Sequence, residues 1–234
     1  MKKLLLLSIF LYSILPINQA YSLDNFYTKL EFGESKATKL KNKFYPDNYK
    51  GGDYNMYKKS PKNSIMSGLG FGYQFNDNIR SDITITNFKS FKYDVNTITS
   101  TGKLEMNQDL SSNAFMANLY YSFKHFSKTV YPFIGVGVGL SSNKTGPIYE
   151  KYTDNDNNHT ELNFDGKRKN NFAWNALVGF GIDFTQRVNI DVFYKYMDLG
   201  KFQSKDTTYL GEPYKGFSTK IKTHNFGLGI RLKF

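Results

Sequence analysis

The end of the chain alternates strictly between two kinds of side chain. One set falls on one face of an extended segment: His224, Phe226, Leu228, Ile230, Leu232 and Phe234. The residues between them are polar, charged or glycine: Asn225, Gly227, Gly229, Arg231 and Lys233. A helix, with 3.6 residues per turn, would mix the two sets. A period of two with charge on one side only predicts a β-strand between an apolar and a polar environment.

The same alternation recurs in seven upstream segments, so the sequence predicts eight strands. The upstream segments are residues 25–34, 64–75, 79–90, 111–123, 130–141, 171–184 and 188–199. Asp, Glu, Lys and Arg do not interrupt the apolar run of any of these faces; Glu34, Lys89 and Asp198 follow such a run only at the last position of the face in their segments. The opposite faces carry the other charged residues of these segments: Lys29, Glu31, Arg80, Asp82, Asp183, Asp191, Lys195, Arg231 and Lys233. Each segment is long enough to cross the hydrocarbon of a membrane at a tilt.

The connections between these segments alternate between short and long. The short ones contain residues 76–78, 124–129 and 185–187, and the long ones are residues 36–63, 91–110, 142–170 and 201–220. A β-sandwich has no reason to sort its connections by parity, whereas outer-membrane barrels have short turns at one rim and long loops at the other. The sequence therefore predicts an all-β, eight-stranded antiparallel up-and-down transmembrane β-barrel with four long extracellular loops and short periplasmic turns.

Phenylalanine marks one rim of this barrel. Every second strand ends, at the short-turn side, on an outward Phe: Phe75, Phe123, Phe184 and Phe234. Aromatic residues make up 17% of the chain, a content typical where rings lie at a membrane interface. We interpret the four residues as a periplasmic aromatic girdle.

The first 22 residues have the features of a secretory signal. Lys2 and Lys3 precede the apolar stretch 4–14, and the small residues of Ala20-Tyr21-Ser22 predict cleavage before Leu23. The expected division is a signal peptide at 1–22 and an outer-membrane barrel domain at 23–234. The chain has no cysteine, which excludes disulfides, thiolate catalysis and Cys-ligated metals.

An eight-stranded barrel has an interior just wide enough for side chains to fill. The inward Lys/Arg and Asp/Glu residues are similar in number, and buried charges must pair. We therefore expect a packed, ion-paired interior, with a narrow conducting channel as the alternative. In the third loop, residues 154–158 with Asp165 partly imitate a calcium loop. His159 stands where that loop needs glycine, so we interpret the segment as a disordered polar loop. We predict no cofactor and no metal.

The first long loop is rich in lysine and tyrosine. Large amphipathic rings among cations suit protein recognition and attract acidic partners, sulfated glycans or lipopolysaccharide phosphates. The candidate partner-binding residues are Lys41, Lys43, Tyr45, Tyr49, Lys50, Tyr54, Tyr57, Lys58 and Lys59. A solvated loop that merely follows the biased composition is the alternative. The net charge of +11 does not indicate nucleic acid, because an exported barrel rarely meets any.

The three histidines give little support to an enzyme. A lipid hydrolase or acyltransferase in a small barrel needs His, Ser and an acid near the outer leaflet. His125 and Ser127 are close in sequence but fall in a periplasmic turn, while His159 lies in the third loop. His224 begins the last strand, with Ser218 and Glu212 in the loop before it. We predict that the protein is not an enzyme.

Taken together, these features resemble the small outer-membrane barrels of the opacity-protein, Ail-like and surface-antigen types. The signal segment, the eight alternating strands and the terminal Phe234 carry the resemblance. The overall layout and the composition rich in Lys, Asn, Tyr and Phe are most similar to rickettsial outer-membrane adhesins. The resemblance implies a monomeric adhesin in the outer membrane of a Gram-negative-type bacterium. Its surface loops would bind host-cell or host-serum proteins, and its membrane part would contact lipid and lipopolysaccharide. The alternatives are a structural or serum-resistance barrel, a lipid-modifying enzyme and a narrow channel.

Overall fold

The structure is a computed structural model that describes residues 25–38, 61–99, 101–124, 127, 129–209, 212–214 and 218–234. The predicted signal peptide lies outside the described residues, and so does most of the first long loop. In the described part of the chain, no helix is long and apolar enough to cross a membrane.

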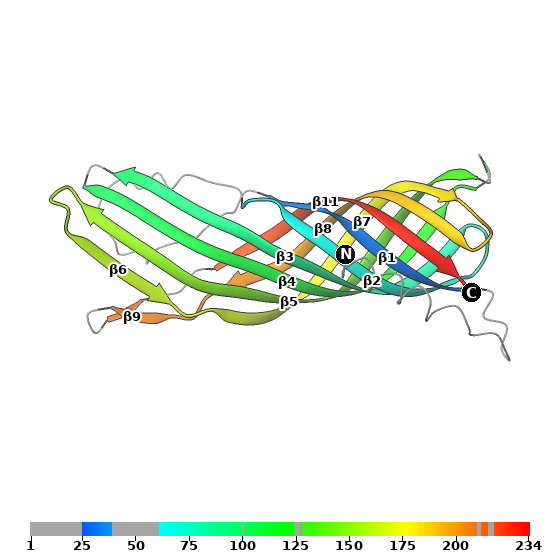
Figure 1. Ribbon diagram of the computed structural model, residues 1–234. Helices are drawn as coiled ribbons and strands as arrows, with labels where there is room; N and C mark the ends of the chain where they lie inside the picture. The colour runs from blue at the N-terminus through cyan, green and yellow to red at the C-terminus, as the bar shows by residue number, and fades with distance from the viewer. Residues whose placement is uncertain are drawn as a thin grey trace, which may run out of the picture.

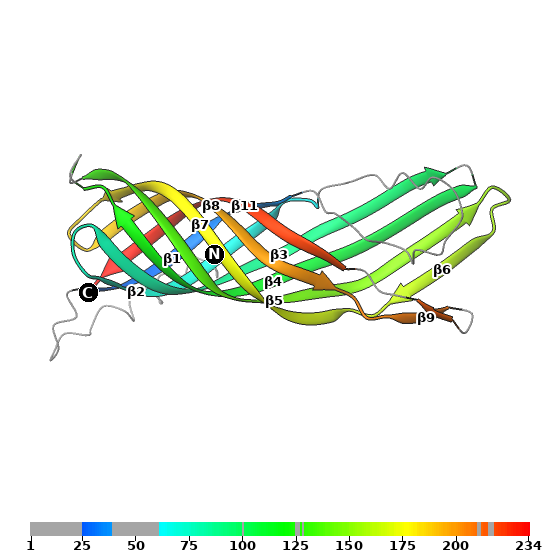
Figure 2. The ribbon, with the colours of Figure 1, turned by 180° about the vertical axis from the view of Figure 1, so that it is seen from behind.

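Eight strands form one closed antiparallel ring (Figures 1 and 2). In ring order they are β1 (Phe26–Ala37), β2 (Ser64–Gln74), β3 (Ile79–Thr99), β4 (Gly102–Ser122), β5 (Val130–Asp154), β7 (Lys167–Asp183), β8 (Val188–Gln203) and β11 (Ser218–Lys233). The first and last strands pair from Tyr27–Lys233 to Ala37–Thr223, which closes the ring. The predicted eight-stranded antiparallel barrel is confirmed.

The strand registers fix the tilt of the barrel. A path of paired residues that starts at Phe172 on β7 crosses all the other strands and returns to β7 at Ile182, a shift of ten residues. A stagger of this size requires strands inclined by about 40° to the barrel axis. Residues at the same height on neighbouring strands are therefore offset from the residues that pair.

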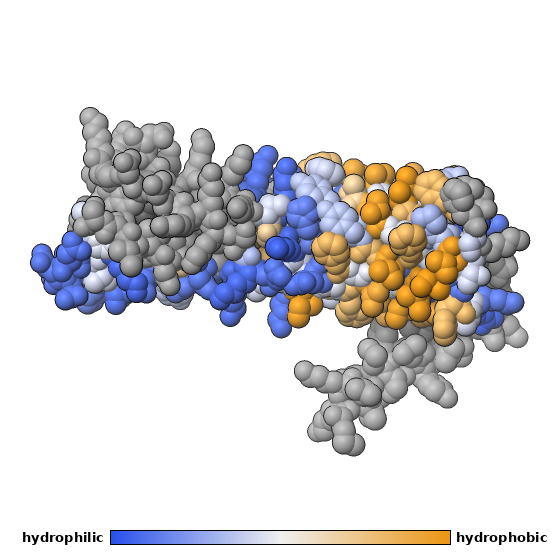
Figure 3. Space-filling model, turned by 90° about the horizontal axis from the view of Figure 1, so that it is seen from above, coloured by the Kyte–Doolittle hydropathy of each residue, from blue (hydrophilic) through white to orange (hydrophobic). Residues whose placement is uncertain are grey.

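The apolar faces point outward, as predicted. Side chains such as Val136, Val178 and Leu228 are more than half exposed, whereas Lys29, Arg80 and Asp191 are buried. Figure 3 shows the apolar side chains gathered in a band near one end of the barrel, with hydrophilic residues over the visible remainder. Exposed apolar side chains in such a continuous belt would be unfavourable in water and are expected against acyl chains.

Glycines on the inward faces make room for rings and amides. A Cβ at Gly181 would lie 2.6 Å from the Tyr131 ring. A Cβ at Gly137 would meet the side-chain amides of Asn118 and Asn175, which are hydrogen-bonded to each other at 2.9 Å. The inward faces of the strands are therefore rich in glycine because the narrow interior leaves no room for larger side chains at these positions.

Three strands continue far beyond the apolar band. β3, β4 and β5 have 21, 21 and 25 residues, about twice the nine to eleven needed to span the hydrocarbon. Residues 91–99, 102–110 and most of 142–170, which the sequence analysis assigned to loops, are therefore strands. A short strand, β6 (His159–Phe164), pairs with the end of β5, and β9 (Thr207–Tyr209) pairs with β10 (Glu212–Tyr214) as a separate hairpin. We call the four-stranded extension of β3–β6 the distal sheet and this end of the barrel the outer end.

Irregularities in the ladder mark the passage from barrel to distal sheet. The β3–β4 register shifts between Phe88 and Phe91, and the β4–β5 register shifts between Gln108 and Leu110. Bulges of this kind bend a sheet and are common at barrel rims. The first one also changes the phase of alternation, so Phe88 and Phe91 are both fully buried.

The membrane contact can be tested with two sites on the same strand. Val136 lies in the apolar band and Tyr149 in the distal sheet, and both are 60% exposed. We expect Val136→Arg to lower the free energy of unfolding in lipid vesicles by roughly 2–4 kcal/mol, because it places a charge in hydrocarbon. The matched Tyr149→Arg should change it by less than about 1 kcal/mol, because both states expose the side chain to water. Urea titrations of both variants measure the difference, and equal losses would contradict a membrane-embedded band.

Candidate functional site

The half of the barrel interior nearer the short turns, called the lower half, holds a first group of buried charges. The Lys29 ammonium lies 3.0 Å from Glu31 and 2.6 Å from Asp82, and Lys195 lies 2.7 Å from the second oxygen of Glu31. The hydroxyl of Tyr120 accepts a hydrogen bond of 2.7 Å from Lys29 and donates one of 3.1 Å to Asp82. This network joins strands β1, β3, β4 and β8 across the lumen.

A second group surrounds Asp191. Arg231 binds this carboxylate through two nitrogens at 2.8 and 3.0 Å, and Arg80 approaches it at 3.4 Å. Arg80 also lies over the rings of Tyr120 and Phe133, with centroid distances of 4.5 and 4.7 Å. These cation–π contacts help to compensate the weaker ion pair of Arg80.

The predicted ion-paired interior is therefore present among the described residues. The two remaining predicted members, Asp183 and Lys233, lie partly exposed at the short-turn end of the barrel. Asp183 pairs with Lys124 at 2.8 Å.

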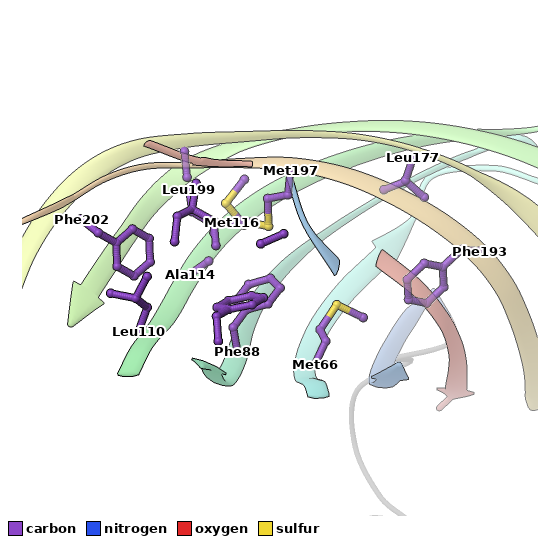
Figure 4. Packing of buried hydrophobic residues seen from close by; sticks show 14 of the residues in the cluster. Met66, Phe88, Leu110, Ala114, Met116, Leu177, Phe193, Met197, Leu199 and Phe202 are labelled. Atoms are coloured by element: carbon purple, nitrogen blue, oxygen red, sulfur yellow. The ribbon is translucent and has the colours of Figure 1, made fainter. Parts of the chain in front are cut away.

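The half of the interior nearer the outer end, called the upper half, is filled by apolar side chains (Figure 4). The sequence analysis did not anticipate this filling. Phe88, Leu110, Met116, Met197 and Phe202 are members of this cluster, and each is almost completely buried. Their signal in the sequence was weak: Phe88, Met116 and Met197 occupy faces that were identified by charges and glycines, and Leu110 and Phe202 lie in segments that were expected to be loops. The described interior is thus packed along its length, which favours a scaffold over a channel.

The outer part of β8 bends inward and closes the upper end of this cluster. Backbone pairing between β7 and β8 stops at Trp174–Asp198, and Gly200 follows with a positive φ of 74°. Beyond that point side chains replace the ladder: the Asn171 amide both donates to and accepts from the backbone of Lys201, at 2.9 and 3.2 Å. This arrangement buries Leu199 completely.

The distal sheet presents a flat polar face to the outside. Tyr149 is exposed at its centre, and its register partners on the neighbouring strands are Asn107 and Asn163. The charges on and beside this face pair with each other: Lys103 lies 2.7 Å from Glu105, and Lys62 lies 2.8 Å from Asp94. A face with an exposed ring, amides and ion pairs is suited to contact with another macromolecule.

Residues 154–158 form a β-hairpin turn, so the prediction of a disordered loop is wrong. The Asp154 carboxylate accepts hydrogen bonds from the backbone N–H groups of Asp156 and Asn158 at 2.9 and 2.8 Å, and Asn157 adopts a positive φ of 63°. The side-chain hydrogen bond from Asn158, followed by these backbone bonds, holds the pKa of Asp154 below its ordinary value. Asp165 is used elsewhere, in a 3.3 Å contact with Lys205. No cluster of three potential metal ligands occurs among the described residues.

The histidines and serines singled out by the sequence do not assemble in the described part of the chain. His224 lies on the barrel exterior, with Nδ1 2.6 Å from the Tyr194 hydroxyl. His159 is exposed at the start of β6. The Ser127 hydroxyl accepts backbone hydrogen bonds from Thr129 and Val130, and His125 lies outside the described residues. Ser218 begins β11, whereas Glu212 belongs to the separate β9–β10 hairpin.

The nine candidate binding residues of the first loop, from Lys41 to Lys59, all lie outside the described residues. Lys36 and Lys62, which flank this segment, are both exposed at the outer end of the barrel. The described ends of the first loop therefore emerge at the same end as the distal sheet.

Comparison with known proteins identifies the family. A family model described as "Outer membrane protein beta-barrel domain" matches residues 4–234. The chain belongs to this family. It is accordingly a protein of the bacterial outer membrane, and by the arrangement general to such barrels the outer end faces the cell exterior.

Several relatives match over most of their length. Outer membrane protein PagN of Salmonella typhimurium is 28% identical over 187 residues, which cover 74% of each chain. A Rickettsia conorii protein whose name begins "Putative adhesin" is 28% identical over 89% of this chain and 82% of its own. A Rickettsia felis protein of the same name is 23% identical over 99% of both chains.

Solved structures show the same fold. Neisserial surface protein A has a TM-score of 0.51 at 18% identity, covering 89% of this chain and 97% of its own. OprG of Pseudomonas aeruginosa has a TM-score of 0.53 at 12% identity, covering 90% and 97%. At these identities the likeness supports the barrel architecture alone.

The interior charges provide a stability test. Glu31 bridges two buried lysines, so Glu31→Leu should lower the free energy of unfolding in vesicles by about 3–5 kcal/mol, because buried Lys195 loses its carboxylate partner and Lys29 keeps only Asp82. Glu34, three residues along the same strand, points outward and is exposed. The matched Glu34→Leu should change the value by less than about 1 kcal/mol. Similar losses for both variants in urea titrations would show that the interior network contributes nothing specific.

The Asp154 turn provides a pH test. Because the folded pKa is lowered, the stabilisation is present above the ordinary aspartate pKa of about 4 and is lost as the pH falls through the folded value. We expect Asp154→Ala to accelerate hydrogen exchange at the Asn158 amide at neutral pH. Asp154→Asn, which keeps an acceptor oxygen but cannot titrate, should retain protection and remove its pH dependence. A wild-type turn with the same protection above and below the folded pKa would argue against this role.

Proposed function

We propose that this protein is a surface adhesin whose extracellular part binds host-cell or host-serum proteins. The observation that carries the proposal is the distal sheet: strands β3, β4 and β5 continue well past the apolar band on a barrel whose described interior is packed. A chain that extends so much ordered structure away from the membrane presents it to partners outside the cell. The names of the two rickettsial relatives agree with this role.

We assign the first contact to the lysine- and tyrosine-rich segment between β1 and β2. Its candidate residues are Lys41, Lys43, Tyr45, Tyr49, Lys50, Tyr54, Tyr57, Lys58 and Lys59. Tyrosine supplies contact area at a small entropy loss, and lysine steers acidic partners. The polar face around Tyr149 would lie beside this contact as a rigid second surface.

The same proposal includes three further properties. Residues 1–22 are a cleaved signal peptide, the barrel is monomeric, and the protein acts by binding rather than by catalysis. The closed ring supports a monomer, because the membrane part leaves no free strand edge. Binding without catalysis is supported by His224, which is engaged with Tyr194 on the lipid-facing side.

Surface display tests the adhesin directly. Expressed in a non-adherent bacterium, the protein should increase attachment to host cells, and purified host surface or serum proteins should be retained by the refolded barrel. Two variants dissect the contact: one replaces the five candidate lysines by glutamine, the other the four candidate tyrosines by serine. Each should reduce attachment by roughly tenfold, because clustered anchors dominate an interface.

A control replaces Lys89 and Lys144 by glutamine, which removes exposed positive charge outside both the first loop and the polar face around Tyr149. This control should leave attachment nearly unchanged. If displayed wild-type protein gives no gain in attachment, the adhesin proposal fails. If attachment survives both loop variants, the assignment to the first loop fails. Envelope defects without any loss of attachment would favour a structural role.

A further inference from the structure

Five aromatic side chains form a continuous array on the outside of the barrel, at the outer edge of the apolar band. We call Trp174, Tyr194, Tyr196, His224 and Phe226 the rim patch. The Tyr196 ring lies 5.5 Å from Trp174 and 5.4 Å from His224. The Tyr194 ring lies 5.9 Å from His224 and 5.1 Å from Phe226. The array crosses β7, β8 and β11, and the 2.6 Å contact between Tyr194 and His224 fixes two of its members.

This array is confined to one side of the barrel. When the shift of ten residues is distributed over the eight strands, the outward positions level with Trp174 are Glu34 on β1, Ile65 and Ser67 on β2, Asn87 on β3, Phe115 on β4 and Leu140 on β5. None of these positions carries a phenol, imidazole or indole ring. A girdle that only positions the protein in the membrane would distribute amphipathic rings around the circumference. The rim patch therefore has a further role.

Lysines border the patch on the side away from the hydrocarbon. Lys36 is the register partner of His224, and Lys222 precedes that histidine on the same face of β11. Lys201 and Lys220 are register partners of each other farther out, and both are exposed. Asp198 lies 4.0 Å from Lys222, but it also accepts a hydrogen bond from the Gly200 backbone. Glu34, the register partner of Phe226, is a second carboxylate beside the patch. The four lysines still outnumber the two carboxylates, so the described surroundings carry a local excess of positive charge.

We propose that the rim patch binds the phosphorylated sugar headgroup of a glycolipid in the outer leaflet. The rings lie where acyl chains end and headgroups begin, and their faces can stack on the C–H face of a pyranose. The lysines lie one step farther out, where they can pair with phosphates on that sugar. An ordinary phospholipid could satisfy the lysines, but it has no sugar to cover the rings. The inference goes beyond adhesion and does not depend on it.

The chain contains its own reporter for this binding. Trp174 is the single tryptophan of the sequence and a member of the patch. The full chain is refolded in phosphatidylcholine nanodiscs and titrated with lipid A, and tryptophan emission is followed. We expect a saturable change in emission with lipid A, a much weaker response to lipid A lacking its phosphates, and a weak response to phosphatidylglycerol at matched charge.

Two pairs of lysine substitutions locate the site. Lys36→Ser with Lys222→Ser removes the cations beside the patch, and Lys89→Ser with Lys144→Ser removes two exposed outward lysines on β3 and β5. The first pair should weaken lipid A binding at least about tenfold, since each lysine near an anionic surface contributes on the order of 1 kcal/mol. The second pair should weaken it less than about threefold. A retained shift of the folded band in unheated electrophoresis verifies that both variants fold.

Three results would overturn the proposal. An absent emission change at saturating lipid A would exclude binding at Trp174. Equal weakening by the two lysine pairs would show diffuse attraction around the barrel. Equal responses to phosphatidylglycerol and lipid A would show that the sugar is not recognised. As an independent check on ring stacking, Tyr196→Leu should weaken binding of lipid A and leave the phosphatidylglycerol response unchanged.

Discussion

The structure depends on the closure of the hydrogen-bonded ring within hydrocarbon. Backbone amides and carbonyls in a bilayer have no water to bind, so a sheet that crosses it must leave no edge. Pairing of β1 with β11 over residues 27–37 satisfies that requirement. Once the ring is closed, alternation leaves each residue one of two environments, acyl chains or a narrow lumen. Apolar residues take the first, while charged residues, glycines and the upper apolar cluster fill the second.

Ring closure also explains why both proposed binding surfaces lie on the outside of the barrel. Eight strands enclose a lumen that their own side chains fill, with ion pairs below and apolar groups above. The bent tip of β8, held by Asn171 and Asn143, completes the filling. Because the described lumen is packed, the chemistry available to partners is on the exterior. There the proposed adhesive surface extends into the medium and the rim patch lies at the edge of the apolar band, so under the two proposals they would bind different partners without competing.

The membrane part of the fold could be predicted from the sequence because one constraint acts there without interruption. Each lipid-facing position excludes charge, so the alternation is legible in segments such as 130–141 and 224–234. The distal sheet could not be found in this way, since both of its faces tolerate polar residues. Its strands also change phase at the bulges: Phe88 and Phe91 point the same way, as do Thr145 and Ile148. At each bulge the alternation of inward and outward residues is interrupted. A sequence pattern of period two therefore predicts the end of the strand there, although the strand continues.

The same limits apply to the candidate sites. The ion-paired interior followed from the rule that buried charges pair, but which residues pair depends on registers that a single sequence does not reveal. The partnership of Trp174, Tyr196 and His224 likewise required the β7–β8 and β8–β11 registers. The first loop was recognisable by its composition alone, and composition says nothing of geometry.

The interior charges have a consequence for folding that is separate from their contribution to stability. Glu31 on β1 pairs with Lys195 on β8, and Asp191 on β8 pairs with Arg231 on β11 and Arg80 on β3. Shifting any one of these strands by a single residue would turn its charged face toward acyl chains and leave the partners unpaired in the lumen. The buried network therefore penalises every nearby wrong register more heavily than an apolar lumen would. On this view the ion pairs are retained because they specify the arrangement in which the ring closes, even if a well-packed apolar interior could be equally stable.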